Sequence, residues 1–298
     1  ALLTPPERWA QLALALELSF PGPGSGAANF VATSGFTVAP RLIGWLHKGP
    51  IAAAVNVELR LAPARMLYAT SLHNSFAWGV AAGGETITFA GDYTITLTET
   101  LVISGNLTID GGGHAITVSG NNAVRVFRVT GNSLVTLDTL TVTHGFGGSD
   151  FDCSLLAQCG GGIKVEDGVT LTLTHSAVIS NTASRGGGIH NDGVMLVAQS
   201  VISGNAATLG GGIGSMHVLT VQQSVVANNT ATGGGAGIYD AHPYRGGSLT
   251  VEESLIADNV GGGIQAESTA GYDDPVTIRN STIVRNSSAG WGGGIQAG

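Results

Sequence analysis

Asp110 and Asp138 are the acidic residues whose placement comes nearest to a chemically active pair. Each follows a short run of alternating apolar and threonine residues, Leu-Thr-Ile before Asp110 and Val-Thr-Leu before Asp138. If these runs are equivalent strands on adjacent coils, the two carboxylates lie side by side, which raises one pKa or recruits a cation. Glycoside hydrolysis uses two carboxylates about 5 to 9.5 Å apart, and calcium-assisted elimination needs a carboxylate cluster and a base. No third acid or base joins this pair, so both residues are weak ligand-site candidates and no catalytic or metal-binding residue is assigned.

Two predicted insertions, residues 147–160 and 267–275, carry further acidic residues. These residues are Asp150, Asp152, Glu267, Asp273 and Asp274. Carboxylate oxygens are ligands that calcium prefers, but neither insertion has the spacing of a calcium-binding loop. We therefore predict solvated loops and no cofactor, with calcium as the one ion that these loops would hold.

The remaining residues that commonly bind metals are histidines and cysteines. His144, His175 and His190 do not recur at a ligand spacing, and we predict surface or loop positions for them. Cys153 and Cys159 are the only cysteines and lie six positions apart in the first insertion. A disulfide between them fits an oxidising compartment, and two free thiols are the alternative.

Two repeated signatures organise the C-terminal half of the chain. Gly-Gly-Gly-Ile or a close variant occurs six times, at intervals of 24 to 31 residues. Between these signatures, a serine is followed five residues later by an asparagine. The asparagines are Asn181, Asn205, Asn229, Asn259 and Asn286. A period of about 25 residues is typical of one coil of a solenoid. An asparagine at the same turn of every coil can stack its amide on the next, so we predict a structural ladder.

Each coil contains three short apolar segments, for example at 171–173, 177–179 and 186–189. Aligning the serines stacks aliphatic residues into columns. One column is Leu173, Val197, Val221, Val251 and Ile278, and another is Val178, Ile202, Val226, Ile256 and Ile283. A slip of one residue would turn such a column outward, so the register is strongly specified. We therefore predict an all-β fold, a right-handed parallel β-helix of about eight coils with three short strands per coil.

The N-terminal part of the chain is organised differently. Residues 1–69 carry no repeat, and we predict a poorly defined segment there. Leu72, Phe76 and Val80 lie four positions apart after Ser71, which can cap a helix. This spacing predicts a short cap helix at 71–82 over the open end of the first coil. The β-helix domain is then expected to span residues 70–298 and to be truncated at its C-terminus.

Composition excludes several classes of protein. Charged residues make up 11% of the chain, and the net charge is -8, which gives no basic surface for nucleic acid. No apolar run of 18 residues predicts a transmembrane helix. The chain has 47 glycines, but their spacing lacks the three-residue period of collagen. Regularly placed aliphatic residues argue against disorder.

The repeats resemble those of a known family. Val178 to Asn181 followed by Gly187 to Ile189 is similar to the repeat of the chlamydial polymorphic outer-membrane proteins, in which phenylalanine typically takes the first position. The stretch from Ser71-Leu72 to Phe89 resembles the start of bacterial surface β-helix proteins with a CSLREA-type motif, of which only Ser-Leu is retained. These resemblances imply export and display on a bacterial outer-membrane or extracellular surface. They transfer no catalytic residue.

The sequence favours a non-catalytic exported rod, a stalk or adhesin-like passenger whose partners are surface glycans or proteins of a host or neighbouring cell. The alternative is a polysaccharide lyase, a glycoside hydrolase or a carbohydrate-binding module, because the pectin-lyase-like architecture also hosts such proteins. Fold alone does not decide activity, so the sequence is compatible with both a non-catalytic rod and an enzyme.

Overall fold

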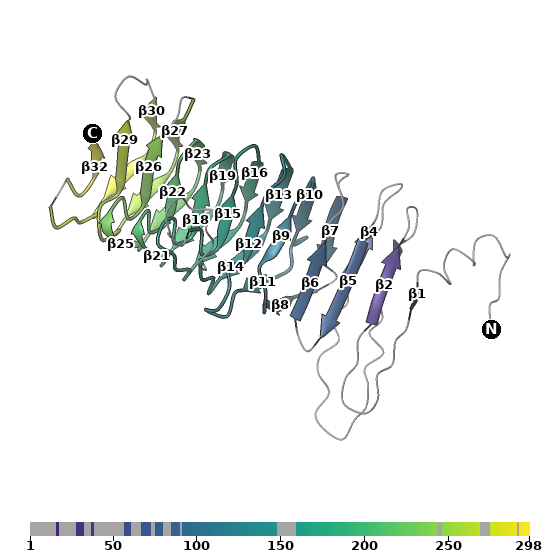
Figure 1. The fold of residues 1–298 in the computed structure, drawn as a ribbon. Helices are drawn as coiled ribbons and strands as arrows, with labels where there is room; N and C mark the ends of the chain where they lie inside the picture. Colours follow the sequence, from purple (N-terminus) through teal and green to yellow (C-terminus); the bar gives the residue numbers. More distant parts are fainter. Residues whose placement is uncertain are drawn as a thin grey trace, which may run out of the picture.

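The computed structural model describes residues 91–147, 159–242, 246–268, 275–290 and 292–298, together with seven strand segments before residue 90. These segments are β1 (Leu16–Glu17), β2 (Ala28–Ala32), β3 (Thr37–Val38), β4 (Val57–Arg60), β5 (Leu67–Leu72), β6 (Ser75–Gly79) and β7 (Glu85–Phe89). All regular elements in this part of the chain are strands, which from β7 onward stack along one axis (Figure 1). Among the described residues, no helix of the length and hydropathy of a membrane span is found.

Three parallel sheets form the solenoid, and the chain adds one strand to each sheet in turn. Sheet 1 contains β7, β10 (Leu107–Asp110), β13 (Leu134–Asp138), β16 (Thr170–Thr174), β19 (Val194–Ala198), β23 (Val218–Gln222), β27 (Ser248–Glu252) and β30 (Val276–Arg279). Sheet 2 contains β8 (Tyr93–Thr96), β11 (Ile116–Ser119), β14 (Leu140–Thr143), β17 (Ala177–Ile179), β20 (Val201–Ser203), β24 (Val225–Ala227), β28 (Leu255–Ala257) and β31 (Thr282–Val284). Sheet 3 contains β9 (Leu101–Ile103), β12 (Phe127–Val129), β15 (Ile163–Val165), β18 (Ile189–Asn191), β22 (Ile213–Ser215), β26 (Ile238–His242), β29 (Ile264–Ser268) and β32 (Ile295–Ala297).

This arrangement confirms the predicted parallel β-helix with three short strands per coil. The described strands stack in eight levels, so the chain makes seven full turns between the first and the last level. A short fourth strip, β21 (Ala206–Leu209) paired with β25 (Thr230–Gly234), lies between sheets 2 and 3 along the chain.

The aliphatic columns form the interior of the solenoid, in the predicted register. Leu173 pairs with Val197, and the column continues to Ile278 in sheet 1. Val178 pairs with Ile202, and the column continues to Ile283 in sheet 2. Burying one such side chain stabilises the fold by about 1.5 to 3 kcal/mol, so the alternation of buried and outward positions fixes the register at every level.

The glycine triplets are needed where the chain turns over the outside of sheet 3. Gly186 has a φ of 58°, in the left-handed region. A Cβ at Gly186 would lie 2.0 Å from the carbonyl oxygen of Ile189, and one at Gly187 would lie 2.4 Å from that of Ala206. The turn therefore requires glycine for backbone conformation at the first position and for close backbone approach at the second.

The predicted cap helix at 71–82 is wrong. Residues 71–72 end β5, and residues 75–79 form β6, which pairs antiparallel with β5. The spacing of four between Leu72 and Phe76 fits a helix, but four is also an even number, so it fits the two-residue period of a strand equally well. Pairing with the neighbouring strand decides between the two.

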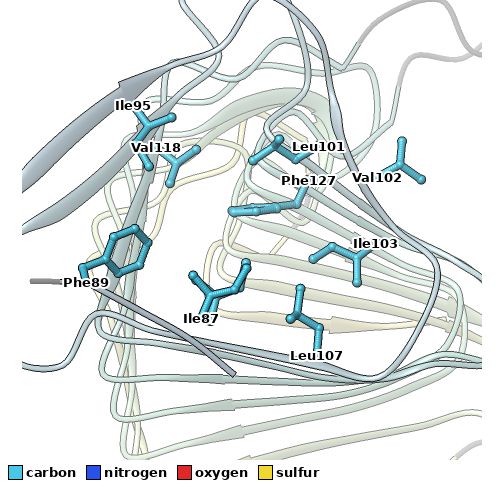
Figure 2. A pocket seen from close by; sticks show the side chains of 10 residues that line it. Ile87, Phe89, Ile95, Leu101, Val102, Ile103, Leu107, Val118 and Phe127 are labelled. Carbon is cyan, nitrogen blue, oxygen red and sulfur yellow. The ribbon is translucent and has the colours of Figure 1, made fainter. Parts of the chain in front are cut away.

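The solenoid core is visible from its first levels in Figure 2. Ile87, Leu101 and Phe127 come from different strands and point into the space that the coil encloses. A small cavity lined by apolar side chains is left there, and β6 lies against β8 and β9 at the same end. The end of the solenoid at which the first strands lie is therefore filled mainly by apolar side chains.

Candidate functional site

The structure places Asp110 and Asp138 next to each other on the outer face of sheet 1, where they are paired residues of β10 and β13. Asp110 accepts a hydrogen bond of 2.6 Å from the backbone N–H of Gly112 through Oδ1. This bond closes the turn that follows β10, as the Asp-Gly-Gly-Gly sequence suggests. Asp110 therefore has a local structural role as well as a carboxylate neighbour on the next coil.

Asp138 is the better connected member of the pair. It accepts hydrogen bonds from Thr174 Oγ1 (2.6 Å), His175 Nδ1 (2.8 Å) and Thr139 Oγ1 (3.1 Å). Burial raises the pKa of Asp138, but the three hydrogen bonds together outweigh burial and leave the pKa below its ordinary value. The Asp138 carboxylate is thus held in its charged form by groups of its own and the next coil.

His175 is a base beside the pair, which the sequence prediction missed. It lies at the corner between β16 and β17 with a φ of 45° and a largely exposed side chain. The hydrogen bond to Asp138 raises the pKa of His175, against a smaller effect of desolvation. A hydrogen bond with the Gln199 side chain on the next coil also raises the pKa of His175. Asp138 and His175 together can accept or donate a proton at the surface of sheet 1.

A second polar cluster lies on the outside of sheet 3 and was not predicted. Lys164 of β15 donates to Asp192 Oδ2 at 2.6 Å, and His190 Nε2 of β18 lies 3.0 Å from Asp192 Oδ1. The Lys164 side chain is only 2% exposed. His190 was predicted at the surface, but it is buried, so that prediction is wrong. The turns formed by the glycine triplets fold over sheet 3 and cover some of its outward side chains. The length of the repeat does not reveal this covering.

Burial and charge act in opposite directions within this cluster. Burial is the largest effect on Asp192 and raises its pKa, but the contacts with His190 and Lys164 outweigh burial and leave the pKa far below its ordinary value. Burial lowers the pKa of His190, and the contact with Asp192 only partly opposes this effect. The buried site therefore contains a charged carboxylate bound to a neutral imidazole and an ammonium group.

The same pattern recurs along the outer row of sheet 3, in which an acidic residue connects two coils. Arg128 Nε donates to Glu166 at 2.5 Å. Further along, Glu267 accepts from Tyr239 Oη at 2.8 Å and from Gln265 Nε2 at 2.7 Å. Burial, followed by the contact with Glu267, raises the pKa of Tyr239 to about 12. A sequence signal existed for the donors, because Arg128, Lys164 and Tyr239 each directly follow an inward residue at the first position of a strand.

One acidic residue lies inside the coil rather than outside it. Asp240 takes the interior position that Asn191 and Ser215 occupy on earlier levels. Its Oδ1 lies 3.1 Å from Nε2 of the buried His242, which also contacts the carbonyl oxygen of His217 at 2.8 Å. These polar groups replace the valines found at the same column in β12 and β15.

The first insertion is attached to the rod by Arg125. This buried guanidinium donates to the carbonyl oxygens of Gly147, Cys159 and Gly160, at 2.6, 2.8 and 2.9 Å. Cys159 is disulfide-bonded, while Cys153 lies outside the described residues. Arg125 thus binds the chain on both sides of residues 148–158, where the sequence changes most from the coil pattern.

The other predicted ligand candidates are the acidic residues of the two insertions. Asp150, Asp152, Asp273 and Asp274 lie outside the described residues. Glu267 is part of β29 and hydrogen-bonds within the outer row of sheet 3. Within the described part of the chain, no three His, Cys, Asp or Glu side chains are grouped so that they could hold a metal ion.

The predicted asparagines lie at the corner between sheets 2 and 3. In each pair, the Nδ2 group donates to Oδ1 of the asparagine on the next coil at 2.8 to 3.1 Å, and the backbone N–H donates to the same atom at 2.9 to 3.0 Å. Each Nδ2 also donates to a carbonyl oxygen of the preceding coil. The serines form a parallel row at the other end of sheet 2, where each backbone N–H donates to the next hydroxyl at 3.1 Å.

Comparison with known proteins gives the family. The sequence model of the right-handed β-helix region matches residues 127–297, which is more than half of the chain. The chain therefore belongs to the right-handed β-helix family. No curated protein and no solved structure matches it. Because one fold hosts many activities, the function of the chain depends on the side chains that the fold carries.

Proposed function

We propose that this chain is a non-catalytic, exported β-helix rod, a stalk or adhesin-like passenger of a bacterial surface. The observation that carries this proposal is the direction of its repeated side-chain hydrogen bonds. The asparagine and serine rows bond each coil to the next along the rod axis, so the repeating polar groups hold the rod together. Seven steps of about 4.8 Å between the eight levels give a spacer of about 34 Å.

Two further observations support display outside the cell. The disulfide at Cys159 suits an oxidising compartment, since thiols stay reduced in the cytosol. The similarity of the repeat to the polymorphic outer-membrane proteins and of residues 71–89 to CSLREA-type proteins points the same way. Partners of such a rod would be surface glycans or proteins of a host or neighbouring cell. Protease treatment of intact producing cells, which should remove the rod while cytosolic proteins persist, tests the location.

A second function is favoured by one specific observation, the hydrogen-bonded Asp138 and His175 beside Asp110. These residues supply a carboxylate pair and a base on one open face, which polysaccharide cleavage needs. A lyase, a glycoside hydrolase or a carbohydrate-binding module with its site on sheet 1 is therefore the alternative. Calcium, if it takes part, would find its carboxylate oxygens here or in the two insertions.

Product analysis separates these two functions. The purified chain is incubated with neutral and acidic polysaccharides, with and without calcium, and the products are analysed by mass spectrometry. We expect no cleavage products. Cleavage that is lost in Asp138→Asn and His175→Gln, and kept in the control Gln223→Ala at another corner of the same row, would overturn the non-catalytic proposal. A glycan array then distinguishes an adhesin from an inert stalk.

A further inference from the structure

The Asp-Gly pair occurs three times in the chain, at Asp110, Asp167 and Asp192, and the structure describes all three. In such a pair the glycine nitrogen can attack the carboxyl carbon of the aspartate side chain, because glycine has no side chain that hinders the approach. Atoms that are held in contact react much faster than atoms that move apart freely. The three pairs have the same chemistry, so differences in their reactivity come from the surrounding fold.

The pair at Asp167 lies in an exposed turn at the corner between β15 and β16. The turn is closed by a hydrogen bond of 3.2 Å from the Val169 N–H to the carbonyl oxygen of Glu166, and Gly168 has a φ of 75° at its third position. The Gly168 N–H donates to Oδ1 of Asp167 at 2.8 Å. The nitrogen of this pair is therefore already in contact with the carboxyl group that it would attack.

The pair at Asp192 lies at the same corner on the next coil, but its groups bond elsewhere. The Asp192 carboxylate binds Lys164 at 2.6 Å and His190 at 3.0 Å. The Gly193 N–H donates to Oδ1 of Asn191 at 3.1 Å. Although burial raises the pKa of Asp192, the contacts of its carboxylate leave this pKa far below its ordinary value. A charged carboxylate is a poor target for a nitrogen nucleophile, so both its charge and the position of its glycine N–H protect this pair.

The pair at Asp110 is held by the hydrogen bonds between two coils. The Gly111 N–H donates to the carbonyl oxygen of Asp138 on the next coil at 2.9 Å. Oδ1 of Asp110 accepts a hydrogen bond from the Gly112 N–H, one residue beyond the nitrogen with which the carboxyl group would react. A reaction here requires the loss of a hydrogen bond between coils, which makes it slower.

We propose that Asp167 is a site of isoaspartate formation, a backbone modification that needs no enzyme and no reactant other than water. The Gly168 nitrogen forms a bond to Cγ of Asp167 and loses its proton, while the hydroxyl group of the protonated carboxyl leaves, so that one water molecule is released. The product is a five-membered succinimide ring. Water then opens this ring at either carbonyl carbon. Attack at Cγ restores aspartate, and attack at the main-chain carbon gives isoaspartate, in which the chain continues through the former side chain.

The modification changes the corner in two ways. Isoaspartate adds one carbon to the backbone of the turn, so the hydrogen bond between Val169 and Glu166 has to adjust. It also leaves a free carboxylate on Cα, which isoaspartyl methyltransferases modify. Because Asp167 and Gly168 are exposed, the product is accessible to such an enzyme, which can therefore be used to detect it.

Incubation of the folded chain for several weeks at physiological temperature tests this proposal. A mildly acidic buffer is used, because the protonated carboxyl group is the form that loses water. Electron-transfer mass spectrometry of peptides locates isoaspartate, and an isoaspartyl methyltransferase with a labelled methyl donor measures its total amount. We expect isoaspartate at Asp167 to accumulate at least about tenfold faster than at Asp110 or Asp192, because hydrogen bonds have to break first at the other two pairs.

Two variants assign the methyltransferase signal to this site. Asp167→Glu should remove most of the signal from the folded chain, since glutamate would have to close a six-membered ring, which forms more slowly. Asp92→Glu, at an exposed aspartate that is followed by tyrosine, is the matched control and should leave the signal unchanged. Circular dichroism confirms that both variants are folded. A signal that persists in Asp167→Glu would overturn the proposal.

The same incubation in urea separates the effect of the fold from that of the sequence. Unfolding removes the hydrogen bonds that distinguish the three pairs, so their rates should become similar. Equal rates at the three pairs in the folded chain would overturn the proposal. A preference for Asp167 that is as strong in urea as in the folded chain would also overturn it, since the cause would then lie in the neighbouring sequence.

Discussion

The asparagine ladder and the outer row of sheet 3 both connect coil to coil through side-chain hydrogen bonds, but they are built from opposite principles. An asparagine amide donates and accepts, so identical side chains complement each other on successive coils. Lys164 only donates and Asp192 only accepts, so their neighbours along the row have to differ. The same amide side chain can therefore occupy this position on every coil. A row of charged side chains instead needs residues of different type on neighbouring coils, because like charges repel.

The two regions also differ in how continuously their side chains bond from coil to coil. Asn205 is buried between Asn181 and Asn229 and bonds to both of them. In the outer row, the pattern breaks at Gly214, which has no side chain to offer between His190 and Tyr239. We therefore expect damage to the ladder to cost more stability than damage to the row.

Removing one amide from the ladder should give the largest effect. Asn205→Ala leaves the backbone N–H of Asn181 and the carbonyl oxygen of Val178 without their partners in a buried site. Each unsatisfied buried group costs about 1 to 3 kcal/mol, so the free energy of unfolding should fall by about 3 to 5 kcal/mol. Urea unfolding measures this loss. Ser203→Ala on the outside of β20 is the control, and a loss below about 1 kcal/mol for Asn205→Ala would contradict the ladder's importance.

Breaking the row should cost less than breaking the ladder. Asp192→Asn removes the carboxylate that binds both Lys164 and His190, and we expect a loss of about 2 to 3 kcal/mol. A double-mutant cycle with Lys164→Met, Asp192→Asn and the variant carrying both substitutions isolates the interaction between these two side chains. A coupling energy of about 1 to 2 kcal/mol is expected for residues in direct contact. Additive losses in urea unfolding would show that the two side chains act independently.

The buried histidine of the row predicts a dependence on pH. Burial lowers the pKa of His190 in the folded state, and the charged groups around it are Asp192, Lys164 and Arg185. An unfolded histidine has a pKa of about 6.5, so on acidification the unfolded chain takes up this proton first. The contribution of His190 to stability is therefore complete above about pH 6.5 and is lost as the pH falls below that value.

His175 provides the opposite control. Its pKa is raised in the folded state by Asp138, so its contribution is present at low pH and is lost as the pH rises through the folded pKa. Unfolding free energies between pH 7 and pH 5 should fall on acidification for the unmodified chain. His190→Gln should flatten this dependence, and His175→Gln should steepen it. A steeper fall in His190→Gln would show that the imidazole is protonated in the folded state.

The contrast between ladder and row also explains what could be predicted from the sequence. Identical residues at a fixed spacing, such as Asn181 and Asn205 or Val197 and Val221, predict their own contacts because the period gives their relative position. The fold, the register and the interior columns follow from this rule. Lys164 and Asp192 differ in type and lie 28 positions apart, so periodicity does not connect them.

The missed site residues follow from two further physical causes. His190 lies on the outside of its sheet, and it is buried there beside the glycine turn at Gly186. His175 joins Asp138 because a left-handed corner directs its ring toward the preceding coil. The helix predicted at 71–82 failed because a spacing of four does not distinguish a helix from a strand. In all three cases, the deciding contact comes from a neighbouring segment.

The smallest effect concerns the corner that precedes the ladder. Ser180 and Gly204 occupy equivalent corners on successive coils, with φ values of 56° and 65°. A residue with a Cβ pays roughly 1 kcal/mol for this left-handed conformation, so Gly204→Ala should destabilise the chain by about that amount. The space beside Gly204 is open, with the Ser180 hydroxyl 3.8 Å from a built Cβ, so no clash adds to the cost. Ser180→Gly should be neutral or slightly stabilising in urea unfolding. A loss for Ser180→Gly as large as that for Gly204→Ala would show that the serine side chain, rather than the backbone angle, governs this corner.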